Sequence, residues 1–503
     1  MAVLGSGMVF LDSTVVNVAL PVIGHDLNAP TSALQWILNG YLLTLASFIL
    51  LGGSLGDMYG RRRVFVLGAA LFTVASVACA VAPTVEVLIA ARLFQGVAGA
   101  LLTPGSLAMI EASFQRSDRP RAIGAWSGLT GVATALGPLL GGYLVDAVSW
   151  RAVFLINVPI GALVVLASRR VPESKDPRAG HHLDVRGAIL AALGLGGTTY
   201  ALIEAGGNGG SALPWVAGAV GVASLVLFIL AERTSPQPML PLKLFSNRQF
   251  SSANIVTFVV YAALSGVFFL LVSFLQVSLG YTPLAAGAAS LPITVLMLLL
   301  SARSGALAQR IGPRIPLTLG PILVAGGMLL MTGINPGDTY LGSVLPAVLV
   351  FGAGLTLVVA PVTATVLASA DERHSGIASG VNNAVARVGG LIAVAVLPLI
   401  AGITGDRFYH KATMTHGFHV AMIVSAVVAL AGGVIAWLTI NNDVLSTEPD
   451  GRGERPINVS TDYSCAVSGP PWQDRPPEKL VISSPAARGA GAAQPQPEAR
   501  ERG

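Results

Sequence analysis

The 503-residue sequence contains 53% hydrophobic and only 11% charged residues, and its mean hydropathy is +0.71. Soluble globular chains carry about 25% charged residues, so this composition excludes an ordinary soluble domain. The formal net charge of +5 does not indicate a nucleic-acid partner, because the basic residues gather in the short connections between apolar runs.

The apolar runs predict fourteen membrane-spanning helices, since about 20 apolar residues cross a hydrocarbon core about 30 Å thick. In chain order the predicted spans cover residues 2–23, 36–56, 64–82, 86–112, 121–145, 151–168, 187–205, 214–231, 252–278, 284–302, 315–333, 341–368, 376–403 and 418–440. An even number of spans places both termini on one side of the membrane.

Basic residues mark that side. One set of alternate connections carries most of them, from Arg61, Arg62 and Arg63 to Arg314 and Arg373, whereas the opposite set holds only Arg151, Arg407 and Lys411. By the positive-inside rule, both termini are expected to be cytoplasmic, in a multi-pass protein of the cell inner (plasma) membrane.

The two ends of the chain differ in composition. The first span starts close to Met1 without a basic region before it or a small-residue cleavage site after it, so it is not expected to be a removed signal peptide. Residues 442–503 are rich in Pro, Gly, Ser and charge, a composition that predicts a disordered cytoplasmic tail. Cys79 lies in a span and Cys465 in this tail, so no disulfide is expected.

An internal repeat divides the spans into two halves. The stretch "GSLGDMYGRRRVFVLG" at 53–68 matches "GALAQRIGPRIPLTLG" at 305–320, and at the same offset Gly137 aligns with Gly389. The predicted organisation is therefore a six-helix bundle at 1–170, two inserted helices with flanking loops at 171–249, a second six-helix bundle at 250–441 and the tail at 442–503. Related halves are typical of secondary transporters.

Several motifs resemble those of the major facilitator superfamily. "GSLGDMYGRRR" is similar to its cytoplasmic-loop motif, "RLFQGVAG" at 92–99 to its fourth-helix motif, and "GPLLGG" at 137–142 to its antiporter motif on the fifth helix. "LDSTVVNVALP" at 11–21 and "WRAVFLINVPIG" at 150–161 resemble signatures of the fourteen-span drug:proton antiporter branch. The resemblance covers about residues 1–440 and implies an all-α integral membrane protein with the major facilitator fold, two pseudo-symmetric bundles plus two extra helices.

The loop motif predicts a conformational latch. Its members are Gly53, Asp57, Gly60, Arg61, Arg62 and, at the end of the fourth span, Glu111. Glycines allow a tight turn, and Asp57 with the arginines can form charge-assisted bonds to neighbouring helix ends. The alternative is that the arginines only anchor the chain at the lipid surface. Gln309 replaces the acid in the second copy, which weakens the latch there.

The antiporter motif on the fifth span predicts close helix packing. Gly137 and Gly141 are spaced i, i+4, Gly142 adjoins them, and Pro138 removes one backbone donor. The resemblance implies that packing at these residues seals one side of the transport path.

Three charged residues inside the spans are the proton-coupling candidates: Asp12, Arg92 and Glu204. A carboxylate at bilayer depth costs about 2.5–3.5 kcal/mol on insertion scales and usually serves an ion or proton pathway, so Asp12 is expected to face the central cavity. Arg92 either faces that cavity or snorkels to the surface. Glu204 is either a second coupling acid or an interfacial residue, and Arg387 in the thirteenth span has no acidic neighbour in sequence.

No enzyme class is indicated. "GGSLG" at 52–56 matches G-x-S-x-G but ends a membrane helix instead of following a strand, and no phosphate-binding loop or metal motif occurs, so no cofactor or metal is expected. A receptor or a structural membrane protein would not explain the two halves.

We expect a proton-coupled antiporter, a monomer that exports lipophilic drugs or antibiotics by alternating access. The alternative is a dedicated exporter of one endogenous metabolite or antibiotic made by a neighbouring biosynthetic cluster.

Overall fold

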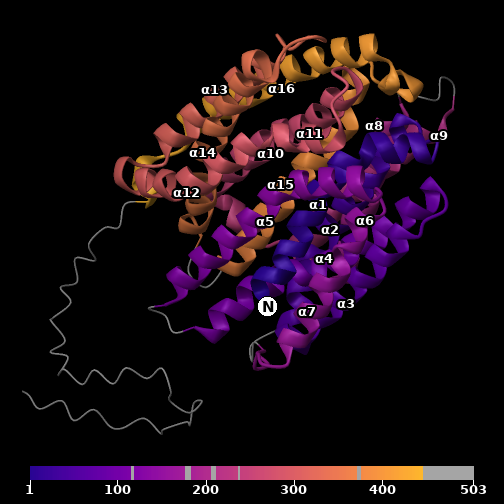
Figure 1. Ribbon diagram of the computed structural model, residues 1–503. Coiled ribbons are helices and arrows are strands. Elements are labelled where there is room, and N and C mark those ends of the chain that lie inside the picture. The colour runs from indigo at the N-terminus through magenta and orange to yellow at the C-terminus, as the bar shows by residue number, and fades with distance from the viewer. Residues whose placement is uncertain (115–117, 176–182, 206–210, 236–237, 371–374, 446–503) are drawn as a thin grey trace, which may run out of the picture. The chain divides into compact units, whose positions relative to one another are not determined.

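A computed structural model describes residues 1–114, 118–175, 183–205, 211–235, 238–370 and 375–445. This part of the chain is helical (Figure 1). The predicted tail, 442–503, lies outside it except for the short η5 (Asn442–Leu445).

The first half comprises α1 (Ala2–Asp26), α2 (Thr31–Tyr59), α3 (Arg61–Ala80), α4 (Val85–Ser113), α5 (Arg119–Ala147), α6 (Ala152–Leu155) and α7 (Asn157–Ser168). A hairpin follows, α8 (Val185–Glu204) and α9 (Leu213–Thr234), and then η1 (Leu242–Ser246). The second half comprises α10 (Arg248–Val277), α11 (Pro283–Ala289), α12 (Leu291–Ile311), α13 (Arg314–Met331), η2 (Tyr340–Val344), α14 (Leu345–Ala368), α15 (Ser375–Ile400), η4 (Gly405–Tyr409) and α16 (Lys411–Thr439).

Thirteen helical stretches within the described residues are long and apolar enough to cross a membrane, so the predicted count of fourteen is not reproduced. The missing one is the sixth predicted span, which is divided at Ile156 into α6 and α7. Pro159 lacks a backbone N–H and therefore cannot donate to the carbonyl of Leu155, which explains the break.

Helices of each half pack mainly with one another, and three pairs of helices form the main contacts between the halves. In the first half α2 and α3 pack on α4, and α1 packs on α5; in the second, α13 packs on α14 and α16, and α10 on α15 and α16. The seam between the halves is formed by α2 with α15, α5 with α11, and α1 with α10 (Figure 1). The hairpin helix α8 packs on both α2 and α15, so the inserted helices cover this seam.

The bundle has two ends, which we name by the connections found there: the Asp26 end, where α1 meets α2, and the Arg61 end, where α2 meets α3. Hydrogen bonds between the halves gather at the Asp26 end. Gln35 Nε2 donates to the carbonyls of Val394 and Ala395 at 2.7 and 3.1 Å. The other pairs are Thr31 with Gly405, Gln276 with Val18, Asp146 with the backbone of Leu284, and Tyr409 with Ala29. The halves are therefore fastened together at the Asp26 end.

Candidate functional site

Asp12 in α1 and Arg92 in α4 form an ion pair inside the first half. Nη1 of Arg92 lies 2.5 Å from Oδ2 of Asp12, and both residues are 0% exposed. Burying two charges is favourable only when they are paired and their remaining polar atoms are hydrogen-bonded. The surrounding side chains meet that requirement for Asp12.

Neutral polar side chains from α3, α4 and α7 complete the environment of Asp12. Gln95 Nε2 and Asn157 Nδ2 each donate to Asp12 Oδ1 at 2.9 Å. The Ser76 hydroxyl accepts from the same two amides at 2.8 and 3.1 Å. The Asp12 carboxylate therefore accepts from three side-chain donors, an arrangement suited to its ionised form.

Arg92 is held by the backbone of α2 and by aromatic rings. Its Nε donates to the carbonyl of Ile37 at 3.0 Å, and its Cζ lies 4.3 Å from the ring centroid of Tyr41. The Tyr41 hydroxyl in turn donates to the carbonyl of Val9 at 3.2 Å. The ion pair therefore links α1, α2 and α4, so a change in its charge state would act on the packing of three helices.

These positions correct the expectation for Asp12 and exclude one of the two alternatives for Arg92. Asp12 does not face an open cavity in this conformation but points into the first half, and Arg92 is buried and paired instead of snorkelling to the surface. The apolar run shows the depth of Asp12 in its helix, but the rotation of α1 about its axis depends on packing against α4 and α7.

Glu204 lies apart from this cluster. It is the last residue of α8 and half-buried, next to residues 206–210, which are outside the described ranges. The structure does not bring Glu204 to Asp12 or Arg92, because α8 belongs to the hairpin and not to the core of the first half.

The predicted loop motif at the Arg61 end forms an ion pair and a contact to a helix end. Arg61 Nε lies 2.9 Å from Asp57 Oδ1, and its Nη1 donates to the carbonyl of Ala108 near the end of α4 at 3.3 Å. Asp57 and Arg61 therefore connect α2 and α3 to α4. The side chain of Glu111, the expected acidic partner, lies outside the described part of the structure.

The acid that meets this loop is Glu173, which follows α7. Its Oε1 accepts from the backbone N–H of Arg62 at 3.0 Å, and its Oε2 lies 3.7 Å from Nε of both Arg62 and Arg63. Gly60 has φ of +113°, and a Cβ there would lie 2.7 Å from the Glu173 carboxylate. A side chain at Gly60 would therefore be strained and would displace Glu173.

Gly53 has no comparable steric requirement, because a Cβ there would make only an ordinary contact with Pro104 at 3.5 Å. The close approach in this part of α2 is at Gly52, where an added Cβ would collide with the carbonyl of Ala100 in α4. The motif residue is Gly53, but the close helix packing requires a glycine at the adjacent position, Gly52.

The glycines of the α5 motif contact both halves. A Cβ on Gly141 would lie 2.8 Å from Val15 of α1, and one on Gly137 would collide with Thr14. A Cβ on Gly142 would lie 2.7 Å from Cα of Leu284 in α11, and the carbonyl of Pro138 lies against Gly287 of the same helix. One face of α5 thus packs within its own half and the adjacent face packs across the seam.

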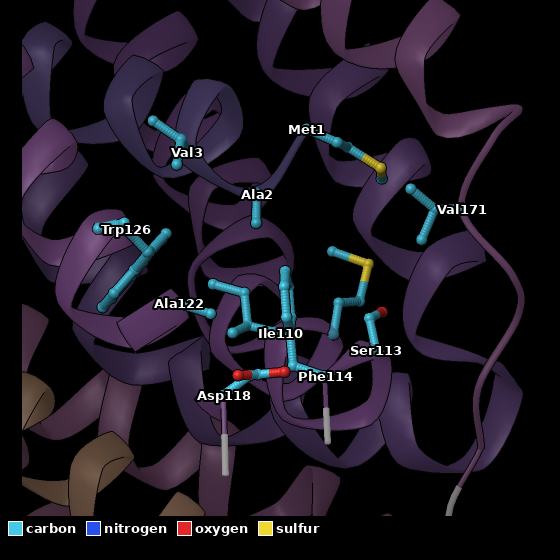
Figure 2. Close-up of a pocket in the computed structure, with 12 residues that line it drawn as sticks. Met1, Ala2, Val3, Ile110, Ser113, Phe114, Asp118, Ala122, Trp126 and Val171 are labelled. Atoms are coloured by element: carbon cyan, nitrogen blue, oxygen red, sulfur yellow. The ribbon is translucent and has the colours of Figure 1, made fainter. Parts of the chain in front are cut away.

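A cavity of about 700 Å³ lies at the Arg61 end, away from the ion pair (Figure 2). It is bordered by the start of α1, the end of α4 and the start of α5, and Figure 2 shows Ile110, Phe114 and Trp126 among its walls. Asp118 contributes a carboxylate to this mostly apolar lining.

The sequence analysis did not predict three residues of these sites: Asn157, Ser76 and Glu173. Asn157 lies within the "INVPIG" stretch, and a lone amide in an apolar run was a usable signal. Ser76 gave none, because serines are common in membrane helices and bond to their own backbone. Glu173 lies in a charged connection where its pairing with Arg62 depends on the position of α7.

Comparison with known proteins agrees with the helical membrane fold described above. The Major Facilitator Superfamily model matches residues 2–394. Multidrug resistance protein Stp of Mycobacterium tuberculosis is 37% identical over 78% of this chain and 73% of its own length. The methylenomycin A resistance protein of Bacillus subtilis is 34% identical over 86% of this chain and 92% of its own.

A solved structure supports the same fold at low sequence identity. The crystal structure of a D-xylose-proton symporter superposes with a TM-score of 0.61 at 14% identity, over 89% of this chain and 98% of that one. Two helical halves, a loop repeated in both, and a family match over most of the described residues lead to one conclusion: this chain is a membrane transporter of the major facilitator superfamily.

Proposed function

We propose that this protein is a proton-coupled antiporter that exports lipophilic drugs or antibiotics by alternating access. The observation that carries the proposal is the buried Asp12–Arg92 ion pair. The names of the relatives, which concern multidrug and antibiotic resistance, support export of such compounds.

The ion pair offers a coupling mechanism because a proton and Arg92 compete for the same carboxylate. Protonation of Asp12 removes the negative charge that neutralises Arg92 and leaves the guanidinium buried without a counter-ion. That state is relieved when α1 and α4 shift and let Arg92 find another partner. Proton binding is thereby linked to a change in helix packing, as alternating access requires.

The cross-half contacts suggest which state this is. With the arginine-rich connections on the cytoplasmic side, the Asp26 end is the outer end, and the hydrogen bonds of Gln35, Asp146 and Tyr409 close it. We therefore assign an inward-facing conformation of a protein in the inner (plasma) membrane, with both termini cytoplasmic. The apolar cavity at the Arg61 end is then accessible from the cytoplasmic side, which suits a lipophilic substrate. The transport cycle requires one chain, so we propose a monomer.

The energy of one proton suffices for export of a neutral compound. An entering proton releases about 2.3 kcal/mol per 100 mV of membrane potential and about 1.4 kcal/mol per pH unit. Since 1.4 kcal/mol corresponds to a tenfold ratio, one proton driven by 100 mV and one pH unit supports a gradient of roughly four-hundredfold. Glu204 remains a second candidate for proton binding at the end of α8.

Reconstitution in proteoliposomes tests the proposal. An imposed pH difference should drive ethidium against its gradient in vesicles with wild-type protein, and Asp12→Asn should bind or exchange ethidium without accumulating it. Uphill transport by Asp12→Asn with the wild-type pH dependence would refute the coupling role of Asp12. A susceptibility panel in a pump-deficient host separates a broad exporter from a dedicated exporter of one metabolite, because only the former protects against several unrelated compounds.

A further inference from the structure

Arg387 is a cation in the middle of a membrane helix that the proposed coupling mechanism does not use. It is the thirteenth of the 26 residues of α15, the helix that packs on α2 across the seam. A charge at this depth is costly and is normally paired or placed where it meets an ion or substrate.

Arg387 has no carboxylate partner within the described ranges, where the other ion pairs occupy Arg61, Arg62, Arg63, Arg92 and Arg151. Its guanidinium lies over the ring of Phe10 in α1, 5.2 Å from the centroid. It also lies close enough to Tyr41 and Tyr261 for its charge to act on both phenols. The rings near Arg387 are therefore uncharged, and the carboxylate of Asp12 is already paired with Arg92.

The contact with Phe10 joins the two halves. Both Arg387 and Phe10 are half-buried, so a small molecule can reach them without unfolding a helix. Ser379 and Asn383 precede Arg387 at four-residue intervals on α15 and are also half-buried, so a polar stripe with a cation at its end follows this helix. Substrate sites of secondary transporters lie near mid-membrane depth between the halves.

Asn39, on the opposing helix α2, has a buried side-chain amide with no hydrogen-bond partner among the residues that the structure describes. Both polar atoms of the Asn39 side chain are without a hydrogen bond within the described residues, and Asn39 is 0% exposed. Asn39 lies one helical turn after Gln35 in α2. Gln35 contacts Val394 of α15, and Leu50, further along α2, contacts Gly380 of α15. By helical spacing, Asn39 lies on the same side of α2, between these two contacts. On α15, Arg387 lies between Gly380 and Val394, the residues that form these contacts. The unsatisfied amide of Asn39 and the guanidinium of Arg387 therefore lie along the same part of the seam.

We infer that Arg387 and Phe10 form an anion-binding subsite, which makes lipophilic compounds with an acidic group, such as a carboxylate on an aromatic ring system, a preferred substrate class. The inference rests on the proposed export function. Arg387 would bind the carboxylate through two parallel N–H donors, a geometry that a guanidinium offers and an ammonium does not. Phe10 would contact the ring system, and Asn39 supplies a neutral donor when the helices of the seam separate.

A matched pair of fluorescent probes tests the inference: 1-pyrenebutyrate, which is anionic, and 1-pyrenebutanol, which has the same ring and is neutral. Binding to the purified full-length protein in lipid nanodiscs is measured by energy transfer from tryptophan to pyrene. Wild-type protein should bind the anion about tenfold more tightly than the alcohol, because a hydrogen bond to a charged group contributes that much. Arg387→Gln should abolish this preference while binding of the alcohol stays within about twofold, and Arg387→Lys should retain only part of it.

Arg407→Gln is the matched control, since it removes an exposed arginine of η4 outside the spans. Equal binding of the two probes by wild-type protein, binding of neither, or an unchanged preference in Arg387→Gln would overturn the inference. Ethidium transport by the same preparations keeps the two proposals apart. Transport of ethidium without an anion preference refutes only the subsite, whereas an anion preference without transport of either ethidium or 1-pyrenebutyrate refutes the export function.

Discussion

Arg62 and Arg314 occupy equivalent positions in the two halves and make equivalent contacts. Each lies in the first turn of a helix that follows a glycine of positive φ, Gly60 at +113° and Gly312 at +84°. The backbone N–H of Arg62 donates to the Glu173 carboxylate at 3.0 Å, and that of Arg314 donates to the Asn442 amide oxygen at 3.2 Å.

Their guanidinium groups show the same correspondence. Arg62 Nη1 donates to the carbonyl of Val171 at 2.8 Å, and Arg314 Nε donates to that of Trp437 at 2.7 Å. In each half the repeated loop is therefore fastened to the region around the end of that half's last helix. The first half uses an acid for this contact and the second uses an amide, so only the first contact includes an ion pair.

The first prediction concerns Glu173. Glu173→Gln keeps the shape but removes the charge that faces Arg62 and Arg63, so the loop contact should weaken by about 1 kcal/mol. We expect reduced transport at nearly normal abundance, measured as ethidium efflux normalised to protein level. Glu86→Gln, at an exposed acid in the first turn of α4, serves as the control. Wild-type efflux by Glu173→Gln would remove Glu173 from the latch, and the same test applies to Asp57→Asn.

The second prediction concerns the ion pair as a unit. Arg92→Gln leaves the Asp12 carboxylate buried without its cation and should lower the free energy of unfolding by about 3–5 kcal/mol, seen as lower abundance and a lower melting temperature. The double variant Asp12→Asn, Arg92→Gln removes both charges and should recover much of the stability but no uphill transport. A double variant as unstable as the sum of the single ones would show that the two charges do not stabilise each other.

The third prediction separates the two faces of α5. Gly142→Leu should push α11 away and open the seam at the Asp26 end, whereas Gly141→Leu should disturb α1 within the first half. A single cysteine at Thr31, introduced in a background without the native cysteines, should be labelled by a membrane-impermeant maleimide faster in Gly142→Leu than in Gly141→Leu. Equal labelling rates in the two variants would contradict the assignment of Gly142 to the seam.

The fourth prediction concerns Tyr409, whose hydroxyl donates to the carbonyl of Ala29 at 2.7 Å. Burial, reinforced by the nearby Asp406, raises the pKa of Tyr409 to about 12. Because the pKa is raised from its ordinary value near 10, the phenol stays protonated and the hydrogen bond persists throughout the physiological pH range.

Tyr409→Phe should therefore weaken closure of the Asp26 end by about 1 kcal/mol and to the same extent at acidic and neutral pH. Maleimide labelling at Thr31 across a pH series measures this effect. A Tyr409→Phe effect that grows or vanishes between pH values would show that another group controls this contact.

The sequence by itself determined the all-helical membrane character and the family, and it contains the loop motif in two copies. These features follow from local properties of the sequence. The length of each apolar run indicates a membrane span, and the repeat of the loop motif at 53–68 and 305–320 indicates two related parts. The contact between Asp57 and Arg61 was also predictable, because the two residues flank the turn at Gly60 between α2 and α3 and are therefore close in space.

The tertiary structure decided which residues meet. Asp12 was expected to face a cavity, yet its partners come from α3, α4 and α7, because the rotation of α1 about its axis depends on helix packing and not on the sequence of α1. The break at Ile156, the pairing of Glu173 with the loop and the position of Arg387 over Phe10 likewise depend on contacts between residues far apart in the chain. An apolar run shows how deep a charge lies in the membrane, but only the packed helices determine which side chain neutralises it.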